Sequence, residues 1–167
     1  MNLLSTSSRL LVAGGIALVM ALAGCSSSKS RVGGVFNLDT DLRLTLLTAT
    51  DSNPDQRGRP SPVIVRLYEL NGAATFDKAD FIDLFEQDEK LLGRELLGKK
   101  TFDPLAPGEQ REQGLVLTEG TTHVGLYAEF SQYRGSAYKV VFPVTQNNVI
   151  RNAVKVRIEG NQLSLAE

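Results

Sequence analysis

The chain has 167 residues, of which 42% are hydrophobic, with 18 Lys and Arg side chains against 19 Asp and Glu, one Cys and one His. This length supports one domain of ordinary size. The balanced charge argues against a nucleic-acid partner, because no basic field exists to hold a polyanion, and one Cys with one His cannot build a Cys/His zinc site or an internal disulfide.

The N-terminal segment has the layout of a secretory signal peptide. Arg9 is the only charged side chain before residue 25, and it precedes the weakly polar to apolar run of residues 10–24. A helix over that run would span roughly 22 Å against a hydrocarbon core of about 30 Å, which disfavours a transmembrane anchor. The sequence therefore predicts export and removal of a signal peptide, residues 1–24.

The apolar run ends in Leu22-Ala23-Gly24-Cys25, which resembles the lipobox of bacterial lipoproteins. Small residues before Cys25 fit a peptidase cleft, and its thiol is the only nearby nucleophile able to take a diacylglycerol as a thioether. A chance Cys after an ordinary signal peptide is the alternative. The resemblance implies cleavage before Cys25, acylation of its new amino group and permanent anchoring in lipid, because each buried methylene contributes about 0.8 kcal/mol. Beyond these acyl chains, no cofactor is expected.

The residues after Cys25 predict a tether to the outer membrane. Ser26 occupies the place where an Asp commonly signals retention in the inner membrane, so sorting to the periplasmic face of the outer membrane is expected. Residues 26–34 are small or charged and offer nothing to pack. We therefore expect a lipidated flexible tether at residues 25–34 and a folded domain at residues 35–167.

The folded part is predicted to be mainly β, because apolar residues alternate with polar ones over short segments. Half-buried antiparallel strands are expected near residues 42–46, 63–67, 95–100, 114–117, 124–130, 138–144, 154–158 and 162–165. Turn signals include Pro107-Gly108, Glu119-Gly120 and Gly160-Asn161, the last forming a tight hairpin. About eight strands in this length indicate a two-sheet β-sandwich.

One segment has helical periodicity instead. A short amphipathic helix capped by Thr75 or Asp77 is predicted to run to about Glu86, with Phe81, Leu84 and Phe85 forming one apolar stripe. This stripe is expected to pack on the sandwich. A helix that binds a partner is the alternative.

No segment predicts catalysis or a metal site. Residues 93–101 satisfy G-x-x-x-x-G-K, but Lys100 replaces the required Ser or Thr and the intervening residues are too bulky to wrap a phosphate. His123 lacks a nucleophile elbow, so a strand-end role is expected. Asp51-Ser52-Asn53-Pro54-Asp55 begins like a calcium loop but lacks its later Gly and Glu. The chain is therefore not expected to be an enzyme.

The best candidate contact surface is the proline-rich segment between the first two strands, residues 50–62. Its prolines and two arginines predict an exposed, locally stiffened loop that loses little entropy on binding. The candidate partner-binding residues are Asn53, Pro54, Asp55, Gln56, Arg57, Gly58, Arg59 and Pro60. A solvated linker is the alternative. Replacing residues 53–60 is expected to leave the sandwich intact.

A succession of motifs across nearly the whole chain resembles the TssJ family, the outer-membrane lipoproteins of type VI secretion systems. The motifs are the lipobox, Asn53-Pro54, residues 58–63 leading into 65–70, Phe76, Ala79-Asp80-Phe81, Leu84, Leu105 and Pro107-Gly108. The resemblance implies a transthyretin-like β-sandwich with an added helix and no catalytic activity. It also implies an anchoring role: binding of the periplasmic C-terminal region of TssM, itself tied to TssL in the inner membrane, through residues 51–62.

A second function remains open from the residues alone. A transthyretin-like lipoprotein could instead bind ligands or act as a chaperone on periplasmic glycans or clients. The genes beside this one would separate the two hypotheses, because genes for the secretion sheath, TssM and TssL should accompany the first.

Overall fold

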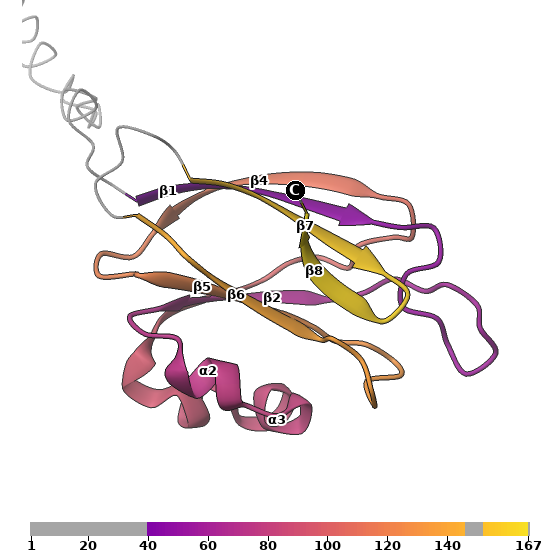
Figure 1. Ribbon diagram of the computed structural model, residues 1–167, viewed down its shortest axis with the longest axis horizontal. Helices are drawn as coiled ribbons and strands as arrows, with labels where there is room; N and C mark the ends of the chain where they lie inside the picture. Colours follow the sequence, from indigo (N-terminus) through magenta and orange to yellow (C-terminus); the bar gives the residue numbers. More distant parts are fainter. Residues whose placement is uncertain (1–39, 146–151, 167) are drawn as a thin grey trace, which may run out of the picture. The chain divides into compact units, whose positions relative to one another are not determined.

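The computed structural model describes residues 40–145 and 152–166, which form two four-stranded sheets (Figure 1). One sheet has the order β4 (Gln110–Leu117), β1 (Thr40–Thr48), β7 (Asn152–Glu159), β8 (Gln162–Ala166). The other has the order β3 (Leu96–Thr101), β2 (Val65–Leu70), β5 (His123–Ala128), β6 (Lys139–Pro143). The predicted eight-stranded, two-sheet sandwich is confirmed.

Alternating burial explains why these segments form strands. On β7, Val156 and Ile158 are buried, while Lys155 and Arg157 are exposed. The final hairpin is also as predicted, with Glu159 paired to Gln162 across Gly160-Asn161. One pairing corrects the expectation of antiparallel strands: β1 and β7 run parallel, with Leu46 opposite Val156.

The main core lies between the sheets, and a second core lies between the β3-β2-β5-β6 sheet and the helices that cover its outer face (Figure 1). β2 therefore buries both faces, because Leu67 faces the first core and Tyr68 the second, each 0% exposed. The approach of helix to sheet is close at Gly125 on β5. A Cβ built there would lie 2.7 Å from the Phe76 ring, so the second core requires glycine at this point.

The predicted single helix is two helices, α2 (Ala74–Lys78) and α3 (Phe81–Leu92), followed by the 3₁₀ turn η3 (Gly93–Glu95). The predicted caps are wrong, since α2 begins after Ala73 and has no side-chain cap. The backbone is extended at Ala79 and Asp80, with ψ of 137° and 163°. Within the predicted stripe, Phe81 and Leu84 are buried, but Phe85 is 48% exposed.

Lys139 at the start of β6 explains the break between the two helices. Its ammonium group donates hydrogen bonds to the carbonyl oxygens of Phe76 (3.0 Å), Asp77 (2.7 Å) and Ala79 (2.5 Å). A cation at a helix C-terminus satisfies carbonyls that lack partners in the helix. Burial lowers the pKa of Lys139. A residue 60 positions away in sequence therefore ends α2, which local periodicity cannot reveal.

Candidate functional site

The β1–β2 loop, residues 49–64, emerges at one end of the sandwich, and Asn53 fixes its base (Figure 1). Asn53 is 2% exposed and has φ of 50°, a left-handed conformation that Asn tolerates better than most residues. Its Nδ2 donates to the Pro62 carbonyl (2.8 Å) and its Oδ1 accepts from the Ser131 N–H (2.8 Å). Its own N–H donates to the Gly160 carbonyl (2.8 Å), so three loops meet at this residue.

Asp55 organises the tip of the loop. Its Oδ1 accepts the N–H groups of Arg57 (2.8 Å) and Arg59 (3.0 Å), while its Oδ2 accepts Nε (2.9 Å) and Nη2 (2.7 Å) of Arg59. The hydrogen bonds from Arg59 lower the pKa of the Asp55 carboxyl. Gly58 closes the turn with φ of 74°. The tip is therefore shaped before any partner arrives.

The candidate residues divide into a buried base and an exposed tip. Asn53 is buried, so its side chain holds the loop rather than facing a partner, and replacing it would disturb three loops. Pro54 and Asp55 are half-buried. The exposed residues are Gln56, Arg57, Gly58, Arg59 and Pro60. Within the described ranges the guanidinium of Arg57 forms no ion pair, whereas that of Arg59 is held by Asp55.

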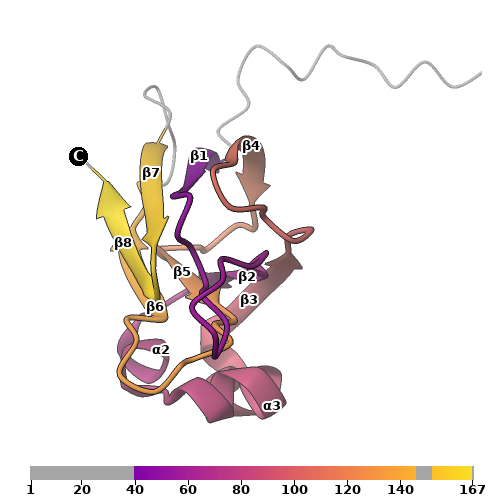
Figure 2. The ribbon, with the colours of Figure 1, turned by 90° about the vertical axis from the view of Figure 1, so that its right-hand side faces the viewer.

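The sequence analysis missed a second segment at this end, the β5–β6 loop at residues 129–138. Gln132 donates from Nε2 to the carbonyl oxygens of Asp55 (2.6 Å) and Pro54 (3.2 Å), which fastens the tip to this loop. Figure 2 shows the two loops beside each other above α3. Arg134 in the same loop is exposed. Its polar residues carry no motif, so only the fold brings them to the candidate site.

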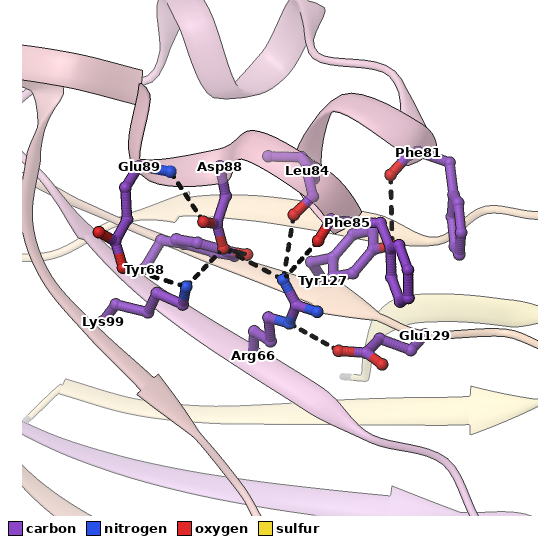
Figure 3. Close-up of polar contacts among 10 residues, drawn as sticks. All are labelled: Arg66, Tyr68, Phe81, Leu84, Phe85, Asp88, Glu89, Lys99, Tyr127 and Glu129. Carbon is purple, nitrogen blue, oxygen red and sulfur yellow. Dashed lines mark hydrogen bonds and ion pairs between the residues drawn. The ribbon is translucent and has the colours of Figure 1, made fainter. Parts of the chain in front are cut away.

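A partly buried polar cluster joins the β3-β2-β5-β6 sheet to α3 (Figure 3). Arg66 Nε lies 2.6 Å from Glu129 Oε1, and its Nη1 lies 3.2 Å from Asp88 Oδ2. Asp88 Oδ2 also accepts the Tyr68 hydroxyl (2.8 Å) and pairs with Lys99 Nζ (2.8 Å). Burial acts to raise the pKa of Asp88, but the hydrogen bonds from Lys99 and Tyr68 outweigh it, and the pKa is lowered.

This cluster holds structure together rather than performing chemistry. Each of its charged side chains faces a group of opposite charge, and burial together with the bond to Asp88 raises the pKa of Tyr68. The hydroxyl therefore stays protonated and occupied as a donor. The arrangement provides neither a free base nor an activated nucleophile.

The other segments considered for chemistry are also placed. His123 is the first residue of β5, with Nδ1 2.9 Å from Thr122 Oγ1, as expected of a strand-end histidine. Residues 93–101 form η3 and β3 instead of a phosphate loop. Across residues 40–145 and 152–166, no group of three or more His, Cys, Asp and Glu could hold a metal ion.

Cys25, the signal peptide at residues 1–24 and the tether at residues 25–34 lie outside the described residues. In the part of the chain that the structure describes, none of the helices has the length and apolar character needed to span a membrane.

Comparison with known proteins identifies relatives by family and by fold. The family model described as type VI secretion lipoprotein (VasD, EvfM, TssJ) matches residues 40–161, and no curated protein gives a significant match. Among solved structures, the T6SS lipoprotein TssJ1 from Pseudomonas aeruginosa has 25% identity and a TM-score of 0.71 over 77% of this chain and 95% of its own.

Two further structures share the fold. Lip of Serratia marcescens, described as a membrane-bound component of the type VI secretion system, has 20% identity and a TM-score of 0.71 over 77% of this chain and 97% of its own. A chain from the structure described as the TssM C-terminal domain (869-1107) from EAEC has 22% identity and a TM-score of 0.61, covering 76% and 98%. The predicted fold, with its inserted helical segment, is therefore that of known type VI secretion lipoproteins.

Proposed function

The chain belongs to the TssJ family of type VI secretion lipoproteins, and we propose that it anchors the secretion membrane complex to the outer membrane by binding the periplasmic C-terminal region of TssM. The observation that carries this proposal is the tip of the β1–β2 loop. Asp55 gives the tip a defined shape, and Arg57 presents a guanidinium without an ion-pair partner among the described residues. Preorganised loops with exposed arginines are favourable contact surfaces, because little entropy is lost on binding.

The membrane end of this function depends on Cys25. We propose that its diacylglycerol and N-acyl chains hold the protein in the periplasmic leaflet of the outer membrane, with the tether at residues 25–34 between lipid and sandwich. TssM would then connect the protein indirectly to TssL in the inner membrane. Such a role requires a surface for a partner and a lipid anchor, and no reaction.

The packing between the sheets favours this role over that of a ligand carrier. The described side chains of the core between the sheets are buried, and Leu44, Leu126 and Ile158 are each 0% exposed. A small ligand would have to displace these side chains to enter the sandwich. The exposed tip needs no such rearrangement to meet a protein.

Binding of the mature lipidated protein, purified in detergent micelles, to the immobilised TssM C-terminal domain of the same bacterium tests the proposal. Arg57→Ala should weaken binding by about tenfold, or 1–2 kcal/mol, because a desolvated arginine–carboxylate pair is lost. Replacing residues 56–60 with Gly and Ser should weaken it further while Asn53 preserves the loop base. Arg43→Ala, an exposed arginine on β1, is the matched control. Unchanged affinity after tip replacement would assign the interface to another surface.

A further inference from the structure

The helix α3 exposes two large apolar side chains on one face. Ile82 is 41% exposed and Phe85 is 48% exposed, and residues three positions apart are neighbours on a helix surface. Most large apolar side chains of the described residues are buried, and the other exposed ones, Val116 and Leu165, lie on separate edge strands. The pair on α3 is therefore a local apolar patch.

Contacts with Phe81 and Arg66 hold the Phe85 part of the patch in place. The Phe85 ring stacks on the Phe81 ring, with 6.3 Å between centroids and 10° between planes. The Arg66 guanidinium lies 5.5 Å from the Phe85 centroid, and Arg66 Nη1 donates to the carbonyl oxygens of Leu84 (3.1 Å) and Phe85 (3.3 Å), as Figure 3 shows. A rigid apolar surface gains more on binding than a mobile one, because less side-chain entropy is lost.

The β5–β6 loop connects this patch to the tip of the β1–β2 loop. The Tyr133 ring stacks on Phe81, which also stacks with Phe85 of the patch. The centroids of the Tyr133 and Phe81 rings are 4.3 Å apart, and the angle between their planes is 11°. The preceding residue, Gln132, bonds the carbonyl oxygens of Pro54 and Asp55. A continuous series of contacts therefore runs from the tip, through the β5–β6 loop, to α3.

The two loops beside the apolar patch carry exposed arginines. Arg57 on the tip and Arg134 on the β5–β6 loop are exposed, and within the described ranges neither guanidinium has an ion pair. Glu86, which follows Phe85 on α3, is also exposed. A complementary segment would carry carboxylates toward the arginines and an apolar side chain toward Ile82 and Phe85.

We infer that the exposed face of α3 is the second half of the partner surface, where Ile82 and Phe85 receive an apolar side chain of the TssM C-terminal region flanked by carboxylates that face Arg57 and Arg134. This inference rests on the proposed function. It assigns the helical insertion a binding role in addition to covering the sheet. The loop tip and the helix then bind one partner from a single rigid surface.

The test measures binding of the mature lipidated protein in detergent micelles to the immobilised TssM C-terminal domain. The double variant I82A/F85A should bind about tenfold or more weakly, since apolar anchors concentrate binding energy, and Ala favours the helix. The matched control is L165A, which truncates a leucine of similar exposure, 49%, on β8. It should bind like the wild type.

Two further variants introduce a charge at Ile82 and leave Phe85 and its contacts unchanged. Ile82→Glu should weaken binding more than Ile82→Lys, because a carboxylate at this position repels an acidic segment whereas an ammonium attracts it. Circular dichroism of each variant verifies the fold. The inference is wrong if I82A/F85A and Ile82→Glu both bind TssM as tightly as the wild type. If the tip variant loses binding in the same assay, the proposed function stands and only the role of α3 is overturned. A wild type that fails to bind TssM would overturn the proposed function and this inference with it.

Discussion

Arg66 on β2 and Asp88 on α3 meet where α3 kinks, with Arg66 Nη1 3.2 Å from Asp88 Oδ2. Gln87 leaves the helical conformation at φ of −144° and ψ of 31°, which interrupts the hydrogen-bond ladder. Arg66 donates to the carbonyl oxygens of Leu84 and Phe85 before the kink, and Asp88 Oδ1 accepts the Glu89 N–H (2.7 Å) after it. The two members of one ion pair therefore bind backbone groups on both sides of the kink: Arg66 binds carbonyl oxygens before it, and Asp88 binds an N–H after it.

We predict that Asp88→Ala destabilises the fold by about 3 kcal/mol or more, because it leaves Arg66 and Lys99 without their shared carboxylate. Urea unfolding of residues 26–167, followed by circular dichroism, measures the change. Glu86→Ala, which truncates an exposed carboxylate on the same helix, is the control and should cost about 0.5 kcal/mol or less. Equal effects of the two substitutions would mean that the cluster does not stabilise α3.

The lowered pKa of Asp88 predicts an acid dependence of stability. A carboxyl whose pKa is lower in the folded state stabilises the fold above the unfolded pKa, which is about 4 for Asp, and this contribution is lost as pH falls through the folded value. The stability gap between wild type and Asp88→Asn should thus be largest near pH 7 and narrow below about pH 4. Unfolding curves at pH 7, 5 and 3 measure it; a constant gap would contradict the assignment.

Gly125→Ala should destabilise the fold by about 1–3 kcal/mol, because the new Cβ would lie 2.7 Å from the Phe76 ring and force α2 away from β5. Gly114→Ala on β4, where a Cβ meets nothing within 4 Å, is the control. Phe76→Leu should recover part of the loss in the double variant. Thermal unfolding of the four variants tests this coupling; purely additive effects would argue against contact between helix and sheet here.

Cys25→Ser should release the protein from the outer membrane and abolish secretion while leaving the sandwich folded, because residue 25 precedes every described strand. Fractionation of cells followed by a high-salt wash measures the attachment, and circular dichroism of the released protein checks the fold. A variant that still sediments with outer membranes after the wash would show that something other than lipid holds it there.

Local sequence was sufficient for the strands and for the family. The alternation of Val156 and Ile158 with charged residues predicts a half-buried strand in any context, because side chains of a strand alternate between its faces. Gly160-Asn161 likewise predicts its hairpin. The lipobox is a short contiguous motif and can be read without a structure. All of these features depend on residues within a few positions of one another.

The tertiary structure alone decided the parallel pairing of β1 with β7, the break between α2 and α3, and the division of the β1–β2 loop into base and tip. Each depends on a contact between distant residues: Lys139 reaches the end of α2, and Ser131 and Gly160 bury Asn53. A polar residue in a loop is expected to face solvent until a distant segment supplies hydrogen-bond partners that make its burial favourable. The exposed loop and its arginines could therefore be predicted from the sequence, but the burial of Asn53 and the contacts that connect this loop to α3 required the fold.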